Sequence, residues 1–353
     1  MFLSKLTINN LRLITRLKIT PHPHINIISG KNGAGKTTIL EAIYLLVRNK
    51  SFRSTSIKNL IKKNHTQINI SATINNSTGY IQHLLLKKSA TDNSFSINGQ
   101  QQNKLTNVAH ALPLGIITPN IHKIIEDGPN QRRRLIDWGV FHVEHDYASL
   151  VRKYKKLLMQ RNAALQGNLK EVVIWDSQLE IISNEITLKR KRSVEGINNS
   201  INDNFSIFFP EYEFQATFRK GWDKNRSLKE SLLKSLKSDK KRGFTSIGPH
   251  RADLIIKING KLSKDVLSRG EQKILAILIV LSNLNNIRSH TKENPILLCD
   301  DIFSELDKEN LALILNQIKQ NKFQTFITTL NKNTHIYDPE LYEMFHVEHG
   351  EIV

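Results

Sequence analysis

The sequence has a single cysteine, Cys299, among its 353 residues, so no disulfide can form within the chain. Scarcity of cysteine is typical of reducing compartments, and we expect a cytoplasmic protein. Long hydrophobic runs are also lacking. The longest, 274–281, is too short to cross a bilayer, which argues against a membrane protein. The first residues alternate like a strand and lack a signal-peptide cleavage pattern.

Acidic residues are few relative to basic ones. The chain has 32 Asp and Glu against 51 Lys and Arg, a formal charge of +19 and a pI of about 9.9. This excess favours a polyanionic partner such as nucleic acid. A coding bias toward Lys, Asn and Ile would give the same composition, so charge alone leaves nucleic acid binding open. Hydrophobic residues at 39% suit a globular protein, and the length accommodates two domains or one with an insertion.

The most informative stretch is 25–40, INIISGKNGAGKTTIL, which contains the complete P-loop pattern G-x-x-x-x-G-K-T. A buried strand is expected before the loop and a helix over 38–47 after it, which is the context that a P-loop requires. Its glycines let the backbone curl around phosphate, and the positive end of the helix faces the anion. Lys36 can reach the β- and γ-phosphates, and the Thr37 hydroxyl can hold Mg²⁺. The predicted ATP-binding residues are Gly30, Lys31, Asn32, Gly33, Ala34, Gly35, Lys36, Thr37 and Thr38.

A second motif follows much later in the chain. The apolar segment 295–299 predicts a buried strand that ends in two carboxylates, Asp300 and Asp301. Paired with a P-loop, this is the Walker B pattern, and we expect Asp300 to hold Mg²⁺ together with Thr37. Asp301 is then placed to orient or deprotonate the attacking water. The predicted catalytic residues are therefore Asp301 and Lys36.

The segment 267–273, LSRGEQK, opens a long apolar helix with a Ser-x-Gly turn. Such a turn at a helix N-terminus can bind an anion, or Ser268 can simply be an N-cap. Because the P-loop already holds the chain's own nucleotide, we interpret Ser268 and Gly270 as contacts to the nucleotide of a second chain. The later stretch 301–307, DIFSELD, supports this interpretation.

Periodicity divides the rest of the chain. Alternating residues predict two N-terminal strands and an antiparallel meander over 67–97. Near Gly128 the pattern becomes helical, and the second helix is expected to end in the basic run 189–192. We expect an ATPase lobe made of 1–118 and 295–353, with a helical lobe over 119–294. The other expected strands are 2–8, 14–19, 211–219, 253–258, 261–262, 323–328 and 344–347, and the other expected helices are 227–238, about 267–287, and 308–320.

Together these motifs resemble an ABC-type ATPase head, with Walker A, an L-S-x-G-[QE] signature, Walker B and a D-loop. The long insertion between Walker A and the signature is similar to the SMC branch, and within that branch the chain resembles the RecF family. The resemblance implies an α/β fold, an SMC-like P-loop ATPase head with an inserted, mainly helical second lobe. The segments that match the RecF family are 10–12, 30–37, 51–53, 131–137, 248–253, 267–273 and 300–307.

The RecF resemblance implies a weak, DNA-stimulated ATPase that uses ATP hydrolysis as a switch. It also implies ATP-dependent homodimers that bind double-stranded DNA and single/double-strand junctions, largely independently of sequence. Such proteins act in DNA repair, recombination, replication and the SOS response, and help load recombinase at single-strand gaps and stalled forks with RecO and RecR. The sequence has no aromatic pattern for stacking single-stranded bases, so we expect phosphate contacts and a steep salt dependence.

Two positions depart from the ABC pattern. Asp301 stands where many ABC ATPases have Glu, and its shorter reach suits slow turnover. Thr328 and Thr329 stand at the end of the predicted strand 323–328, where the switch histidine is expected. The Q-loop residue is expected near 118–120, which contains no glutamine.

Two rival functions are disfavoured. A nucleotide-binding subunit of an ABC transporter would share the three motifs, but the long insertion and the 248–253 element argue against it. A structural SMC-like tether needs heptad arms much longer than 130–195. The segment FHVEH occurs twice, at 141–145 and 345–349. A metal site there is disfavoured, because the first copy lies in a predicted helix and the second ends a predicted strand.

Overall fold

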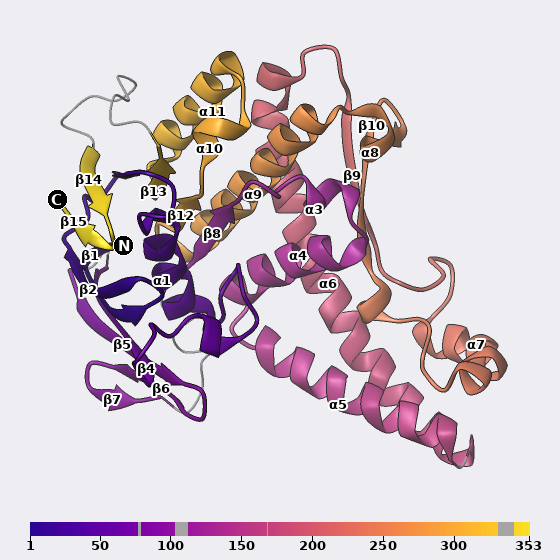
Figure 1. Ribbon diagram of the computed structural model, residues 1–353. Helices are drawn as coiled ribbons and strands as arrows, with labels where there is room; N and C mark the ends of the chain where they lie inside the picture. Colours follow the sequence, from indigo (N-terminus) through magenta and orange to yellow (C-terminus); the bar gives the residue numbers. More distant parts are fainter. Residues whose placement is uncertain (77–78, 103–111, 168, 331–341) are drawn as a thin grey trace. The chain divides into compact units, whose positions relative to one another are not determined.

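The computed structural model describes residues 1–76, 79–102, 112–167, 169–330 and 342–353. Contacts among these residues divide the chain into two compact units (Figure 1). Unit 1 contains 1–121 and 291–353, and unit 2 contains 122–290. From the sequence alone, the divisions are expected after residues 118 and 294.

One sheet of unit 1 is antiparallel. Its strands are β1 (Phe2–Leu11), β2 (Ile14–Ile19), β4 (Gln67–Asn75), β5 (Ile81–Ser89), β6 (Asn93–Ile97) and β7 (Gln100–Gln101). They lie in the order β2-β1-β4-β5-β6-β7. Burial alternates along β4, where Ile68, Ile70 and Ile74 face the core, so one face of the sheet is covered. The N-terminal hairpin and the meander predicted from alternation are confirmed.

The second sheet of unit 1 carries the P-loop. Its strands are β3 (Ile25–Ser29), β8 (Leu114–Ile117), β12 (Ile296–Cys299), β13 (Gln324–Thr329), β14 (Tyr342–Glu348) and β15 (Glu351–Ile352). They lie in the order β15-β14-β3-β13-β12-β8, and all except β15 pair in parallel. β3, β12 and β13 are buried along their whole length, as expected for parallel strands covered on both faces. Their carboxyl ends meet at one edge, where such sheets bind ligands.

Helix α1 (Lys36–Arg48) follows the P-loop and contacts strands of both sheets, including β1, β4, β5 and β13 (Figure 1, indigo). Residues 38–47 are all buried, which explains why this stretch is almost continuously apolar. Burial against two sheets fixes the helix, and with it the loop at its N-terminus. The other helices in the part of unit 1 that the structure describes are η1 (Ile57–Asn59), α10 (Ile302–Glu305) and α11 (Lys308–Asn321).

Unit 2 is mainly helical. Its helices are α3 (Lys123–Glu126), α4 (Pro129–Val143), α5 (Tyr147–Gln166), α6 (Leu169–Phe208), α7 (Leu228–Arg242), η2 (Pro249–Arg251), α8 (Ser263–Val266) and α9 (Arg269–Thr291). Three strands, β9 (Phe214–Arg219), β10 (Asp253–Ile258) and β11 (Lys261–Leu262), form a small antiparallel sheet. α5 and α6 pack against each other, and apolar residues along both helices are buried, including Leu150, Tyr154, Leu179 and Ile186.

The expected helix end at 189–192 is wrong, because α6 continues to Phe208. Lys189 lies 2.6 Å from Glu144 through Nζ and Oε2, and Arg190 lies 2.7 Å from Asp137 through Nε and Oδ1. These charges therefore form ion pairs inside unit 2 and do not mark the end of α6. The local charge pattern does not show this, because the partners lie 45 and 53 residues away in the sequence.

The two FHVEH copies have different geometries, as predicted. His142 is buried at the end of α4, with its ring edge-on to Trp138, whereas His346 lies on the strand β14 beside Ser29 and Glu348. Among the described residues, no cluster of three or more His, Cys, Asp or Glu has the arrangement of a metal site. Within the same residues, every helix is too short or too polar to cross a membrane.

Candidate functional site

The P-loop joins β3 to α1 through three glycines in the left-handed region. Gly30, Gly33 and Gly35 have φ values of +151°, +77° and +117°. A Cβ atom at Gly30 would also collide with the carbonyl oxygen of Val347 on β14. The local fold thus requires glycine at this position for steric as well as conformational reasons. Gly35 is the N-cap of α1 and provides no side chain to bond its first N–H groups, which leaves them available to an anion.

Lys36 lies inside the loop that precedes it. Its Nζ donates hydrogen bonds to the carbonyl oxygens of Gly30 at 2.7 Å and Lys31 at 3.0 Å. Burial lowers the pKa of the ammonium, and the negative charges of Asp301 and Asp300 oppose part of that shift. The lysine is therefore held over the loop by weak carbonyl acceptors, which phosphate oxygens can replace with a stronger, charge-assisted bond.

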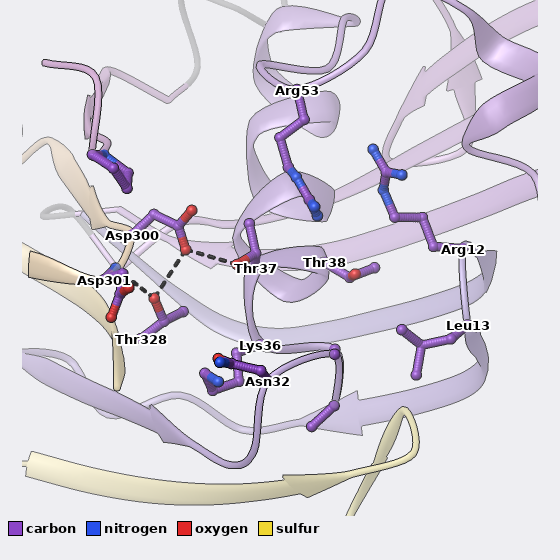
Figure 2. Close-up of a pocket in the computed structure, with 14 residues that line it drawn as sticks. Arg12, Leu13, Asn32, Lys36, Thr37, Thr38, Arg53, Asp300, Asp301 and Thr328 are labelled. Atoms are coloured by element: carbon purple, nitrogen blue, oxygen red, sulfur yellow. Dashed lines mark hydrogen bonds between the residues drawn. The ribbon is translucent and has the colours of Figure 1, made fainter. Parts of the chain in front are cut away.

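Two hydroxyl groups meet the predicted acidic pair. Thr37 Oγ1 donates to Asp300 Oδ1 at 2.8 Å, and Thr328 Oγ1 donates to the same oxygen at 2.9 Å (Figure 2). The backbone N–H of Asp301 donates to Thr328 Oγ1 at 2.8 Å. β12 and β13 are adjacent parallel strands, so their ends bring Asp300, Asp301 and Thr328 together. The two residues predicted to hold Mg²⁺, Thr37 and Asp300, thus lie next to each other in the structure.

A cavity of about 430 Å³ opens over these groups. Its lining includes most of the predicted ATP-binding residues of the P-loop and both carboxylates. The other two predicted residues, Gly30 and Lys31, contribute the carbonyl oxygens that hold Lys36. Five lining residues are not among the predicted site residues, although all five lie in or next to segments that the sequence analysis singles out. The cavity is lined by Arg12, Leu13, Asn32, Gly33, Ala34, Gly35, Lys36, Thr37, Thr38, Arg53, Pro119, Asp300, Asp301 and Thr328.

Arg12 reaches this cavity from the turn between β1 and β2. Its guanidinium bonds both carboxylate oxygens of Glu41, a fully buried residue of α1, and Ser51 donates to Glu41 as well. The hydrogen bond with Glu41 raises the pKa of Arg12, so the group stays charged. The Arg53 backbone N–H donates to Ser51 Oγ at 2.9 Å. Glu41 thus anchors both arginine-bearing segments to α1.

Ser268 and Gly270 lie in unit 2, at the start of α9, and both are exposed. The Ser268 backbone N–H donates to Glu271 Oε2 at 2.8 Å, and the Glu271 N–H lies 3.4 Å from Ser268 Oγ. This reciprocal pair is a capping box, so the N-cap alternative raised by the sequence describes the structure. It does not exclude an external ligand, because the turn is open to solvent.

The 248–253 element is held by arginine side chains in unit 2. Arg190 Nη1 donates to the carbonyl of Pro249 at 2.6 Å, and Arg132 Nε bonds the carboxylate of Asp253 at 2.8 Å. Arg132 comes from the segment 131–137, so two stretches that match the same family contact each other. In the described structure these bonds hold the 248–253 element against α4 and α6.

His250 is part of this arrangement. Its Nε2 lies 3.0 Å from the carbonyl of Thr245, which makes that nitrogen the donor, so Nδ1 accepts from the Tyr154 hydroxyl at 2.6 Å. Burial lowers the pKa of His250 to about 4. The neutral ring therefore acts as a fixed crosslink between α5 and the loop before η2.

Comparison with known proteins places these features in a family. Residues 2–353 match the RecF/RecN/SMC N terminal domain. The chain is 34% identical over 373 residues to the DNA replication and repair protein RecF of Hahella chejuensis, covering 100% of this chain and 99% of that protein. It is 35% identical to the RecF protein of Aliivibrio fischeri, with 99% of each chain covered.

Solved structures agree with these relatives. The structure of a recombination mediator protein, RecF-ATP in the RecFOR pathway, has a TM-score of 0.88 at 26% identity and covers 100% of this chain and 97% of its own. An SMC head bound to the C-winged helix domain of ScpA has a TM-score of 0.62 at 17% identity, with 100% and 97% covered, and shares the fold. The chain belongs to the RecF family of DNA replication and repair proteins, within the RecF/RecN/SMC group of ATPase heads.

Proposed function

We propose that this protein binds ATP at the P-loop cavity and uses the ATP state to control DNA binding in recombinational repair and replication. The observation that supports this most directly is the cavity itself, which combines Lys36, the uncapped end of α1 and the Thr37–Asp300 pair. The relatives are named as DNA replication and repair proteins, and one similar structure is named as a complex with ATP. A transporter function gains no support from these relatives.

Phosphate and Mg²⁺ fit the residues that are present. Lys36 and the first N–H groups of α1 supply positive charge for the β- and γ-phosphates. The Thr37 hydroxyl can offer a lone pair to Mg²⁺ while it still donates its hydrogen to the Asp300 carboxylate. Asp300 can bind Mg²⁺ directly or through water. When bound, Mg²⁺ would neutralise charge that develops on the phosphates.

Hydrolysis is assigned to the other carboxylate. Asp301 lines the cavity next to Asp300 and can orient or deprotonate the attacking water. Its side chain is one methylene shorter than Glu, which suits a weak ATPase that acts as a switch. We expect Asp301→Asn to bind ATP but to lose about 100-fold in turnover, and Asp300→Asn to weaken Mg²⁺-dependent ATP binding about 10-fold or more.

These variants test the proposed ATPase. ATP binding by calorimetry and phosphate release would be measured with and without Mg²⁺ and DNA. Asp203→Asn, an exposed carboxylate on α6, removes the same charge outside the cavity and should behave as the unaltered protein. A normal hydrolysis rate in Asp301→Asn would remove it from the role of water-orienting group. Absence of ATP binding by the unaltered protein would refute the proposed function.

The ATP state is proposed to be a homodimer. Ser268 and Gly270 are exposed at the start of α9 and can meet the γ-phosphate held by a second chain. ATP binding would then favour the dimer, and hydrolysis would release it. RecO and RecR are the proposed protein partners, in keeping with the RecFOR pathway named for the similar structure.

DNA binding is proposed to use basic surface rather than base readout, on double-stranded DNA and at single/double-strand junctions. In unit 1 a groove of about 600 Å³ is lined by Lys58, Lys62, Lys63 and His65, together with hydroxyl groups of Thr66, Ser89 and Thr91. Lysines and hydroxyls of this kind bind phosphate oxygens. Among the described residues that line this groove, none is acidic. It is therefore our candidate for one contact with the DNA backbone.

The groove has a direct test. Lys58→Ala with Lys63→Ala should lower the slope of log K against log salt by about two, since each phosphate contact contributes about 0.9. The control replaces Lys234 and Lys237, which are exposed on α7 and carry the same charge. Equal effects of both pairs would mean that overall charge, and not the groove, attracts the DNA.

A further inference from the structure

The hydroxyl of Thr328 occupies the centre of the acidic pair. Thr328 lies on β13, is 1% exposed and lines the cavity (Figure 2). Its Oγ1 lies 2.9 Å from Asp300 Oδ1 and 2.8 Å from the backbone nitrogen of Asp301. One side chain on the neighbouring strand therefore contacts both residues to which Mg²⁺ binding and water activation are assigned.

The directions of these hydrogen bonds follow from chemistry. The backbone N–H of Asp301 can only donate, so Thr328 Oγ1 accepts at that contact. The hydroxyl hydrogen of Thr328 is then free to point at the Asp300 carboxylate, which also receives the hydroxyl hydrogen of Thr37. Both hydroxyl hydrogens are directed at Asp300 Oδ1, so the rotation of this carboxylate is fixed before any ligand binds.

Asp301 depends on the same hydroxyl through its backbone. Its φ of +54° lies in the left-handed region, which is unfavourable for a residue with a side chain. Such a conformation persists where surrounding contacts hold it, and the bond from its N–H to Thr328 is such a contact. Because the backbone conformation sets the direction of the side chain, the placement of the Asp301 carboxylate depends on Thr328.

We propose that Thr328 is a positioning residue for ATP hydrolysis, which keeps Asp301 in its left-handed conformation and Asp300 in its orientation toward Thr37. This inference rests on the proposed ATPase function. It also explains how a threonine can stand where ABC ATPases have the switch histidine. Thr328 positions the two acidic residues through its hydrogen bonds with them. We do not assign it the contact to the γ-phosphate that a histidine would make.

The experiment compares three single variants of the full-length chain. Thr328→Val replaces the hydroxyl with a methyl of similar shape, and Thr328→Ser keeps the hydroxyl. Thr325→Val is the matched control, because Thr325 lies on the same strand, is fully buried, and donates a hydrogen bond of 3.2 Å to Phe323 outside the cavity. If Thr328→Val does not fold, Thr328→Ala replaces it, since it adds no methyl beside the carboxylate.

Three measurements separate positioning from a structural role: the turnover number and KM for ATP, the affinity for ATP, and the Mg²⁺ concentration that gives half-maximal ATP binding. We expect Thr328→Val to lose about 10- to 100-fold in turnover, with KM and ATP affinity within about 3-fold, and to need more Mg²⁺. Thr328→Ser should recover most of the turnover. Thr325→Val should match the unaltered protein in all three.

Several results would overturn the inference. Normal turnover in Thr328→Val, an equal loss in Thr325→Val, or a Thr328→Ser variant as slow as Thr328→Val would each show that the hydroxyl does not position the carboxylates. A loss of ATP affinity as large as the loss of turnover would place Thr328 in binding instead. Failure of the proposed function is distinguishable, because the unaltered protein itself would then neither bind nor hydrolyse ATP.

Discussion

The helices α1 and α9 both begin at glycine-containing turns, yet their N-termini differ. α1 starts after Gly35, which offers no side chain to its first N–H groups. α9 starts after Ser268, whose side chain and backbone bond Glu271 in both directions. The first end therefore has no side-chain cap, whereas the second has one. The comparison separates an end built to receive an anion from one that folds stably without it.

The surroundings of the two ends reinforce the contrast. The end of α1 lies in a cavity with the ammonium of Lys36 and two carboxylates. The carboxylates follow β12, which β13 separates from β3. The end of α9 is exposed. A ligand for α9 must then arrive from outside, and the long 3.4 Å contact between Glu271 N–H and Ser268 Oγ is the weaker half of the cap. Because Ser268 Oγ accepts in that contact, the hydroxyl hydrogen of Ser268 can be donated to a phosphate oxygen without breaking it.

The largest expected effect comes from removing the cation at α1. Lys36→Ala should weaken ATP binding by about 100-fold or more, because a charge-assisted bond in a partly buried site is lost. Lys36→Arg should keep the fold but slow hydrolysis, since a planar guanidinium cannot take the place of a compact ammonium. Calorimetry with ATP measures the binding, and phosphate release measures the hydrolysis. The control is Lys18→Ala, which removes an exposed lysine of β2 outside the cavity. Unchanged ATP turnover in either Lys36 variant would remove this residue from the site.

The end of α1 was readable from the sequence because its determinants are contiguous. A strand, three glycines, a lysine and a helix follow one another within 25–47, and each has a local requirement. The opposite wall of the cavity was not readable in this way. Thr328 meets Asp300 across 28 residues of sequence, and Arg12 meets Glu41 across 29. Neither pair has a spacing that marks it, so the contacts emerge only from the sheet order and the packing of α1.

The helical unit shows the same limit. Apolar periodicity predicted α5 and the first part of α6, because a buried seam needs one apolar stripe on each helix. The basic run at 189–192 predicts a helix end, yet α6 continues, because the local charge signal ignores Asp137 within α4 and Glu144 at its C-cap. Most elements of the chain thus followed from local patterns, although the strands β8 and β15 were not expected. The partners of charged side chains did not follow from such patterns.

A smaller effect is expected from blocking α9. Ser268→Arg places bulk and positive charge where the γ-phosphate of a second chain would lie. It should leave ATP binding by the monomer within about 3-fold, abolish ATP-dependent dimerisation, and remove most DNA-stimulated hydrolysis. Mixing it with Lys36→Ala chains should restore at most one composite site per dimer. Sedimentation with ATP and Mg²⁺ measures the dimer.

The matched control for this variant is Ser227→Arg. Ser227 is the N-cap of α7 and forms a capping box with Glu230. The Ser227→Arg variant therefore loses the same kind of cap at another helix of unit 2. A normal ATP-dependent dimer of Ser268→Arg would mean that the signature turn does not close over the nucleotide. Loss of the dimer in both variants would trace the effect to weakened helices.

The smallest expected effect sharpens the comparison most, because it sets two serine caps against each other. Removing a serine N-cap costs about 0.5–2 kcal/mol. The Glu230 N–H lies 3.1 Å from Ser227 Oγ, whereas the Glu271 N–H lies 3.4 Å from Ser268 Oγ. Ser227→Ala should therefore destabilise unit 2 more than Ser268→Ala, by a melting shift of about 2–4 °C per kcal/mol. In ATP-dependent dimerisation the order should be reversed, with Ser268→Ala impaired and Ser227→Ala normal. Thermal unfolding and sedimentation of the same samples reveal whether the variant that loses more stability is also the one that dimerises normally. If Ser268→Ala is the milder variant in both measurements, its hydroxyl is only a cap, and α9 has no share in binding nucleotide.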